Sequence, residues 1–140
     1  MLYRQSVSPK AAKSSPFTDV TDSWSVDAVN WAFEKGVVNG TSPTTFSPND
    51  AITRQDMATI LYNYTKNVLD LDVYDTADLT GYPDYSTISD YARTPLSWAV
   101  AQGVILGVGN SNGVDTLQPK GDATRAQTAT IIMRFCQNVL

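Results

Sequence analysis

The feature that most constrains this chain is a helix start that occurs twice. The two copies are residues 51–62, AITRQDMATILY, and residues 123–133, ATRAQTATIIM. Thr53 and Thr124 are suited to cap these helices, because a threonine oxygen can accept a hydrogen bond from a free N–H group of the first turn. Asp56 and Gln127 can complete a capping box, in which glutamine fits better than aspartate. Apolar residues at helical spacing follow each cap, so the sequence predicts two related helices.

An arginine follows the cap in both copies, as Arg54 and Arg125. The helix dipole mildly disfavours a cation at this end. However, guanidinium donors beside free backbone N–H groups make an anion site. The alternative is an ion pair with a neighbouring carboxylate, such as Asp50 or Asp122. Because the arginine is repeated, the anion site stays open as an interpretation.

Other residues recur at a nearly constant offset. Trp31, Gly36 and Gly40 reappear 67 positions later as Trp98, Gly103 and Gly107, and Pro48 and Arg54 reappear 71 positions later as Pro119 and Arg125. The difference is an insertion after Gly107, where Gly109 to Gly113 should form a mobile turn. Trp31 and Trp98 are expected in the core. Such an internal repeat predicts an all-α fold of tandem, stacked helix-loop-helix units.

The first helix of each repeat has its own boundary signals. In the first repeat, Asp22 or Ser23 should cap a helix that ends at Lys35 and Gly36. In the second repeat, a turn over residues 89–93 should precede a helix that opens near Thr94, with Pro95 at its first position. Phe46 should anchor the loop between the two helices of the first repeat in the core.

The chain is expected to divide into four parts. Residues 1–16 resemble the end of a preceding repeat followed by an irregular linker, and residues 17–67 form the first repeat. Residues 68–81 form an acidic linker, and residues 82–140 form the second repeat. The linker lacks the glycine and terminal glutamate of a calcium loop, so it is expected to be solvated.

Composition excludes several functions. The chain has 140 residues, no histidine and a formal net charge of −4, which argues against nucleic acid as a partner. No apolar run is long enough to insert in a membrane. We found no metal-ligand cluster, cofactor motif or activated nucleophile, so an enzyme is not expected. Cys136 is interpreted as a buried structural thiol. No signal peptide follows Met1, so the chain is either intracellular or a piece of a longer exported protein.

Two ordered series of motifs in this chain resemble a known family of repeats. The series Phe17-x-Asp19, Trp24, Trp31-Ala32, Gly36-Val37-x-x-Gly40, Phe46-x-Pro48 and Ile52-Thr53-Arg54 resembles the S-layer homology repeat. A second series resembles it as well, from Tyr82-x-Asp84 through Trp98-Ala99, Gly103-Val104-x-x-Gly107 and Leu117-x-Pro119 to Thr124-Arg125. Together they cover nearly the whole chain beyond its N-terminal tail.

The resemblance implies a fold and a function. It implies a pseudo-threefold helical spindle of three repeats. It also implies non-covalent anchoring of an exported protein to the bacterial cell wall, through an anionic, often pyruvylated, secondary cell-wall polysaccharide bound in grooves between repeats. It makes Thr53, Arg54, Thr124 and Arg125 the first binding candidates. The family usually has glutamate where Asp56 and Gln127 stand, so the two grooves need not bind alike.

Six more residues are candidates for sugar contact, each with a structural alternative. Asp19 and Asp84 either bind sugar hydroxyls or form turns through backbone hydrogen bonds. Trp24 either stacks on a sugar ring or belongs to the core, and Tyr91 stands at roughly the matching position of the second repeat. Gly40 and Gly107 either provide turn geometry or let a ligand approach the backbone.

Two functions therefore remain open. The first is a cell-wall anchor at the cell surface. The second is a degenerate repeat pair that serves as a protein–protein contact or spacer without binding glycan. Because two repeats leave a helical face without a partner, we also expect self-association, most simply as a symmetric homodimer or by exchange of a helix.

Overall fold

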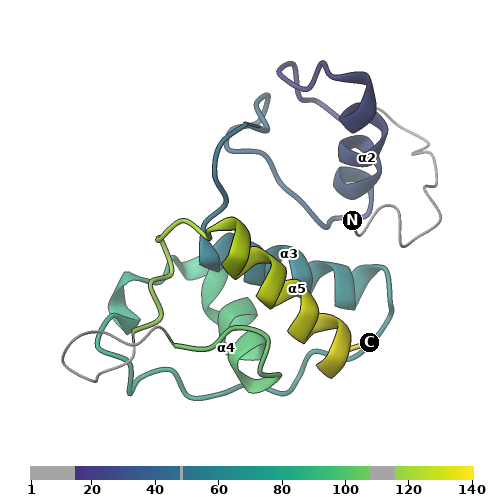
Figure 1. The fold of residues 1–140 in the computed structure, drawn as a ribbon. Coiled ribbons are helices and arrows are strands. Elements are labelled where there is room, and N and C mark those ends of the chain that lie inside the picture. The colour runs from purple at the N-terminus through teal and green to yellow at the C-terminus, as the bar shows by residue number, and fades with distance from the viewer. Residues whose placement is uncertain (1–14, 48, 108–115) are drawn as a thin grey trace. The chain divides into compact units, whose positions relative to one another are not determined.

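The computed structural model describes residues 15–47, 49–107 and 116–140, apart from the side chains of Ser23 and Trp24. These residues form the four helices α2 (Ser23–Glu34), α3 (Arg54–Asn67), α4 (Arg93–Ala101) and α5 (Arg125–Asn138) (Figure 1). The short 3₁₀ helices η1 (Tyr85–Thr87) and η2 (Asp90–Ala92) lie between α3 and α4. Within the described residues there is no β-strand, only an isolated antiparallel bridge between Thr53 and Asp122. The mostly helical class is confirmed, and the threefold spindle stays a prediction.

The chain divides into two compact units. The first contains residues 1–50 and 63–71, and the second contains residues 51–62 and 72–140. Helix α3 therefore begins in the second unit and ends in the first. The beginning of α3, which carries Thr53 and Arg54, shares its unit with the second sequence repeat.

Aromatic side chains make up much of the core of the first unit. Trp31 of α2 is 2% exposed and lies 6.5 Å from the ring of Tyr64 between centroids. Phe17 packs edge-on against Phe33 and lies 5.3 Å from Phe46. Phe46 thereby ties its loop to the rest of the unit, as its position in the sequence predicted.

The core of the second unit gathers around α4. Trp98 is 1% exposed and meets the ring of Tyr62 edge-on at 5.8 Å. Other buried side chains come from α3, α4, α5 and the connection between α4 and α5, namely Met57, Ala58, Leu61, Leu96, Val104, Ile105, Leu117, Ile131 and Phe135. Burying each of the larger ones contributes about 1.5–3 kcal/mol.

Helices α2 and α4 end in the same way, because each is followed by a glycine in the left-handed region. Gly36 and Gly103 both have φ of 70°. The next residue, Val37 or Val104, donates its N–H to the carbonyl of the residue five positions earlier, Ala32 at 2.8 Å or Ala99 at 2.9 Å. This is the Schellman helix end that the Lys35-Gly36 sequence predicted for the first repeat.

One expectation about packing is wrong, and a second holds only in part. Cys136 is exposed, since it lies on the side of α5 away from buried Ile131 and Phe135. The acidic linker is more than a solvated spacer, because Val73 and Leu79 are buried. The Ala77 N–H donates to the Ser97 carbonyl at 3.1 Å, which ties the linker to α4.

Other expectations concern residues that the structure does not describe. These are the tail at 1–14, Pro48 and the turn at 109–113. Helix α4 opens at Arg93, directly after η2, and Pro95 is its third residue. Among the described helices, none combines the length and the apolar character needed to cross a membrane.

Candidate functional site

The beginning of α3 is fastened to the loop that precedes α5. Thr53 caps the helix as predicted, since its Oγ1 accepts the N–H of Asp56 at 3.2 Å. The N–H groups of Arg54 and Gln55 donate to the carbonyls of Gly121 and Pro119, at 3.0 and 2.9 Å. The free N–H groups expected at this helix start are therefore already paired with backbone.

Arg54 is buried in the same contact, with 5% of its surface exposed. Its Nε donates to the Leu117 carbonyl at 2.9 Å, and its Nη2 donates to the Leu106 carbonyl at 2.7 Å. These acceptors are backbone carbonyls, not the carboxylate of an ion pair. Burial, and then the charge of Arg134, lower the pKa of Arg54, but a guanidinium stays charged in proteins.

The Arg54 guanidinium does not use all of its donors. Among the described contacts its Nε and Nη2 groups have acceptors, and its Nη1 group has none. Two bonds use two of the five N–H donors of an arginine, which leaves the others for a ligand.

Tyr91 of η2 also contacts the first turn of α3. Its hydroxyl donates to Asp56 Oδ1 at 2.5 Å, although 58% of the residue is exposed. Desolvation, together with the hydrogen bond to Asp56, raises the pKa of Tyr91 to about 12. Asp56 thus holds Tyr91, and no bond from Asp56 to the N–H of Thr53 completes a capping box among the described contacts.

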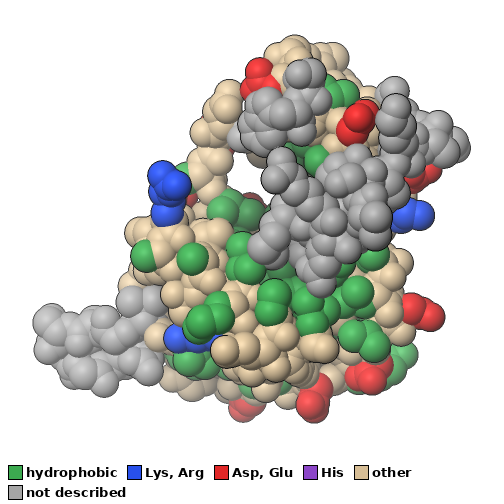
Figure 2. Space-filling model, turned by 45° about the vertical axis from the view of Figure 1, so that its right-hand side comes forward, with side chains coloured by type: hydrophobic (Ala, Val, Ile, Leu, Met, Phe, Trp, Pro, Cys, Tyr) green, Lys and Arg blue, Asp and Glu red, His purple; other side chains and the backbone are tan. Residues whose placement is uncertain are grey.

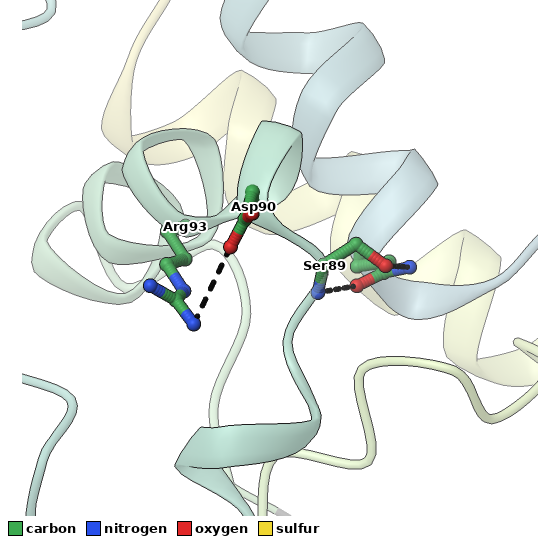
Figure 3. A network of polar contacts seen from close by, with 4 residues as sticks. Ser89, Asp90 and Arg93 are labelled. Carbon is green, nitrogen blue, oxygen red and sulfur yellow. Dashed lines mark hydrogen bonds and ion pairs between the residues drawn. The ribbon is translucent and has the colours of Figure 1, made fainter.

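Gln55 adds further hydrogen bonds between α3 and the segment that carries Tyr91. It is 4% exposed, its Nε2 donates to Ser89 Oγ at 3.0 Å and to the Tyr91 hydroxyl at 3.3 Å, and its Oε1 accepts the Ser89 N–H at 3.0 Å. Figure 3 shows Ser89 directed toward α3, while Asp90 and Arg93 face each other on the other side as a surface ion pair of 3.4 Å. The Tyr91 ring is therefore held at a fixed place beside the Thr-Arg motif.

The beginning of α5 repeats the cap but not the surrounding contacts. Thr124 and Gln127 form the complete capping box that the sequence predicted, with both bonds at 3.1 Å. Arg125 is exposed. In the part of the chain that the structure describes, neither its guanidinium nor its N–H has a hydrogen-bond acceptor.

Asp19 and Asp84 clamp equivalent loops. The oxygens of Asp19 accept the N–H groups of Phe46 and Ser47, both at 2.8 Å. Those of Asp84 accept the N–H groups of Leu117 and Gln118, at 2.9 and 2.7 Å. The second residue of each pair lies in the left-handed region, with φ of 61° for Ser47 and 48° for Gln118. Each carboxylate therefore holds a backbone conformation that is unfavourable by itself.

The remaining candidates are placed as follows. A Cβ on Gly40 would lie 2.3 Å from the Thr45 carbonyl oxygen and 2.5 Å from that of Ser42, so the loop requires glycine there. Gly107 is half-buried, next to Leu106, which accepts from Arg54. The Trp24 side chain lies outside the described residues. Thr53, Arg54, Asp84 and Tyr91 come together in the second unit, where Leu117 donates to Asp84 and accepts from Arg54.

Sequence reasoning missed one repeated contact. Asn138 Nδ2 donates to the Gln102 carbonyl at the end of α4 at 2.9 Å, and Asn67 Nδ2 donates to the Gly36 carbonyl after α2 at 3.3 Å. The two asparagines stand 71 positions apart, the offset of the two arginines, so the repeat itself carried the signal.

Comparison with known proteins gives consistent matches. A family model described as the S-layer homology domain matches residues 16–58 and 81–129. The surface-layer 125 kDa protein of Lysinibacillus sphaericus is 32% identical over 139 residues, which cover 99% of this chain and 11% of that protein. The S-layer protein sap of Bacillus anthracis is 32% identical over 91% of this chain and 14% of its own length. An endoglucanase of Bacillus sp. (strain KSM-635) is 33% identical over 94% of this chain and 13% of its own length. The chain thus spans 11 to 14% of the length of these relatives.

Proposed function

Because this chain belongs to the S-layer homology domain family, we propose that it binds an anionic secondary cell-wall polysaccharide. Domains of this family typically anchor S-layer proteins and surface enzymes to the cell wall. Such a chain holds a larger protein at the bacterial cell surface. The domain itself is non-catalytic, and the name endoglucanase belongs to a relative most of which lies outside the match. The pyruvylated sugars implied by the motifs are the proposed ligand.

The observation that carries the proposal is the arrangement of Tyr91 against the first turn of α3 in the second unit. The hydroxyl of Tyr91 is held by Asp56 while the ring stays mostly exposed. An aromatic ring with one fixed polar end offers an apolar face at little entropic cost to a sugar ring. The Nη1 group of Arg54 and the Thr53 cap belong to the same helix start. Together they provide a stacking surface and a cation for an acidic sugar.

The other candidate residues have different roles in the proposed binding. Arg125 and Thr124 offer a second, more open cation at the start of α5. Asp19, Asp84, Gly40 and Gly107 contribute by shaping the loops. Trp24 is the residue at the matching position of the first repeat. Nucleic acid and membrane lipid are not proposed as partners, because the net charge is −4 and the ligand sites are local.

One observation favours the alternative function. The best-placed donors of Arg54 serve backbone carbonyls, as they would in a repeat pair kept as a spacer or protein contact. The two functions differ in what they require of Tyr91, since a spacer has no need of an exposed ring. Tyr91 therefore separates them.

The experiment is a calorimetric titration of the chain with purified, pyruvylated polymer fragments. Tyr91→Ala should weaken binding at least about tenfold, since an aromatic contact in a binding site is worth more than about 1.4 kcal/mol. The matched control is Tyr74→Ala, which removes a ring that is 88% exposed in the acidic linker. Equal affinity of Tyr91→Ala and the control would remove Tyr91 from the site.

A second pair of variants tests the cation. Arg125→Ala should weaken binding, whereas Arg93→Ala, which removes an exposed arginine on α4, should not. Arg125→Lys should recover only part of the affinity, because a point charge cannot reproduce the two parallel bonds of a guanidinium. Both series are run with the secondary structure checked by circular dichroism.

A further inference from the structure

One polar side chain of the second unit is buried although its helix does not need it. Gln55, in the first turn of α3, is 4% exposed. The equivalent position at the start of α5, 71 residues later, is Ala126. Because α5 begins with a complete capping box, a helix start of this kind forms without glutamine at this position. Burying an amide is costly unless it is hydrogen-bonded, so the partners of Gln55 indicate its role.

The partners of Gln55 fix the orientation of its amide. The N–H of Ser89 can only donate, so the amide oxygen of Gln55, Oε1, faces it at 3.0 Å. The amide nitrogen, Nε2, then faces two hydroxyl oxygens, Ser89 Oγ at 3.0 Å and Tyr91 Oη at 3.3 Å. The two hydrogens of this nitrogen supply one bond to each oxygen. All of these groups belong to the second unit.

The orientation of this amide also sets the direction of the Tyr91 hydroxyl. The phenol oxygen accepts from Gln55, and the phenol hydrogen goes to Asp56 Oδ1 at 2.5 Å, because an ionised carboxylate can only accept. A directed chain of hydrogen bonds therefore runs from the Gln55 amide through the Tyr91 hydroxyl to Asp56. The hydroxyl hydrogen is used within the protein, and the ring of this residue, which is 58% exposed, remains for a ligand.

Gln55 holds the segment that carries Tyr91 at two points. Besides the phenol oxygen, it binds the backbone of Ser89, which lies two residues before Tyr91 and directly before η2. The backbone of Gln55 is fixed as well, because its N–H donates to the Pro119 carbonyl at 2.9 Å. A ring that is held both at its tip and through its backbone loses little conformational entropy when a ligand stacks on it.

The charge of the chain makes the placement of such a ring important. The formal net charge is −4. Among the described residues on the face drawn in Figure 2, lysine and arginine side chains are separate from one another and form no patch. An anionic polymer is therefore not held by a positive field spread over this face. Its affinity depends on short-range contacts, which must already lie where the ligand meets them.

We propose that Gln55 is a positioning residue of the polysaccharide site. It holds the Tyr91 ring in place for stacking on a sugar and does not itself touch the ligand. This role rests on the proposed function, because it acts on affinity only through Tyr91. Without the Gln55 amide, the ring and the Ser89 backbone would be ordered only when the ligand binds, which weakens binding by about two- to tenfold.

The first test is a double-mutant cycle, measured by calorimetric titration of the chain with pyruvylated polymer fragments. Gln55→Met keeps the length of the side chain and removes the amide, and it should weaken binding about two- to tenfold. In the Tyr91→Ala background it should change the affinity by less than about twofold, because the ring that Gln55 positions is gone. The same change in both backgrounds would overturn the proposal, since it would show that Gln55 acts independently of Tyr91.

The matched control is Asn138→Ala. It removes another side-chain amide of the second unit, one that donates to the Gln102 carbonyl at 2.9 Å. It should leave the affinity unchanged in both backgrounds. Gln55→Asn, which is one methylene shorter but keeps a polar group in the buried position, is the second variant if Gln55→Met does not fold. It should show the same dependence on Tyr91.

The second test needs no polymer, so it separates the positioning role from the proposed function. The chain is labelled with 3-fluorotyrosine, and the fluorine resonance of Tyr91 is assigned by its loss in Tyr91→Phe. Gln55→Met should shift this resonance toward its value in the unfolded chain, and Asn138→Ala should leave it in place. An unmoved resonance in Gln55→Met would overturn the proposal even if the polymer binds. A shifted resonance in a chain that binds no polymer would support the hold on Tyr91 and contradict the proposed function instead.

Discussion

At the residue scale, the hydroxyl of Tyr91 donates to Asp56 while most of the ring stays exposed. This bond prefers the neutral phenol, and with desolvation it raises the pKa of Tyr91 to about 12, against about 10 for a free tyrosine. The unfolded chain releases this proton first as pH rises. The stabilising contribution is therefore complete below pH of about 10 and is lost as the pH approaches about 12.

Tyr91→Phe should consequently remove a phenol that ionises late. In an ultraviolet titration of the folded chain, the step near pH of about 12 should be smaller in this variant than in the wild type. If Tyr91→Phe and the wild type titrate identically at that step, the hydroxyl is not held as described.

Asp19 is a second residue whose charge matters to the fold. The N–H groups of Phe46 and then Ser47 lower the pKa of Asp19. A lowered pKa stabilises the folded chain at pH values above the unfolded pKa of about 4, and this stabilisation is lost as pH falls through the lower, folded value. Asp19→Asn should therefore lower the urea midpoint at neutral pH, since its NH₂ group cannot accept an N–H.

The pH dependence supplies the check on Asp19. The difference in urea midpoint between Asp19→Asn and the wild type should shrink as pH falls below about 4. Asp75→Asn, at an exposed linker carboxylate, serves as the control and should behave like the wild type. A midpoint difference that is constant from neutral to acid pH would mean that the charge is not the cause.

What could be predicted for single residues depended on how local their partners are. The cap at Thr124 and the turn-forming alternative for Asp19 follow from neighbours in the chain or from a common backbone habit. The carbonyl acceptors of Arg54 lie 52 and 63 positions away, so the residue type alone could not name them. The bond from Tyr91 to Asp56 likewise depends on a contact between two repeats.

At the element scale, the glycine at the end of α4 determines where the chain turns. Gly103 has φ of 70°, where an L-residue is strained, and an added Cβ would lie 3.2 Å from Asn138 Nδ2. Gly103→Ala should lower the free energy of unfolding by about 1–2 kcal/mol. Gly81→Ala is the control, because a Cβ there meets nothing within 4 Å.

Denaturant unfolding measures both glycine variants. Gly81→Ala should be neutral or slightly stabilising, by up to about 1 kcal/mol, because it restricts the unfolded chain. The opposite order, with Gly103→Ala as stable as Gly81→Ala, would show that the helix end relaxes without cost.

The positions of the helices could be predicted from the sequence, whereas the side of each helix that is buried could be predicted only in part. Thr53, Gly36 and Pro95 mark ends that the structure places within a few residues of expectation. The exposure of Cys136 was not foreseen, because apolar residues line more than one side of α5 and local spacing does not say which side is covered. The burial of Val73 and Leu79 was not predicted, because two isolated apolar residues among aspartates form no recognisable pattern.

At the scale of the whole molecule, the net charge of −4 gives no long-range attraction to an anionic polymer. Affinity must then come from short-range contacts at local sites such as Tyr91 and the arginines. Raising the ionic strength from 0.1 to about 0.5 M should weaken binding only modestly, because partly buried pairs are poorly screened. A steep loss of calorimetric affinity with salt would indicate diffuse surface electrostatics instead.

The function proposed for this chain is recognition of the secondary polymer of the bacterial wall. Its most direct test is co-sedimentation of the purified chain with cell-wall sacculi that either carry this polymer or have been stripped of it. The chain should pellet with polymer-bearing walls and stay in the supernatant with stripped walls. Equal amounts in both pellets, or none in either, would contradict the claim.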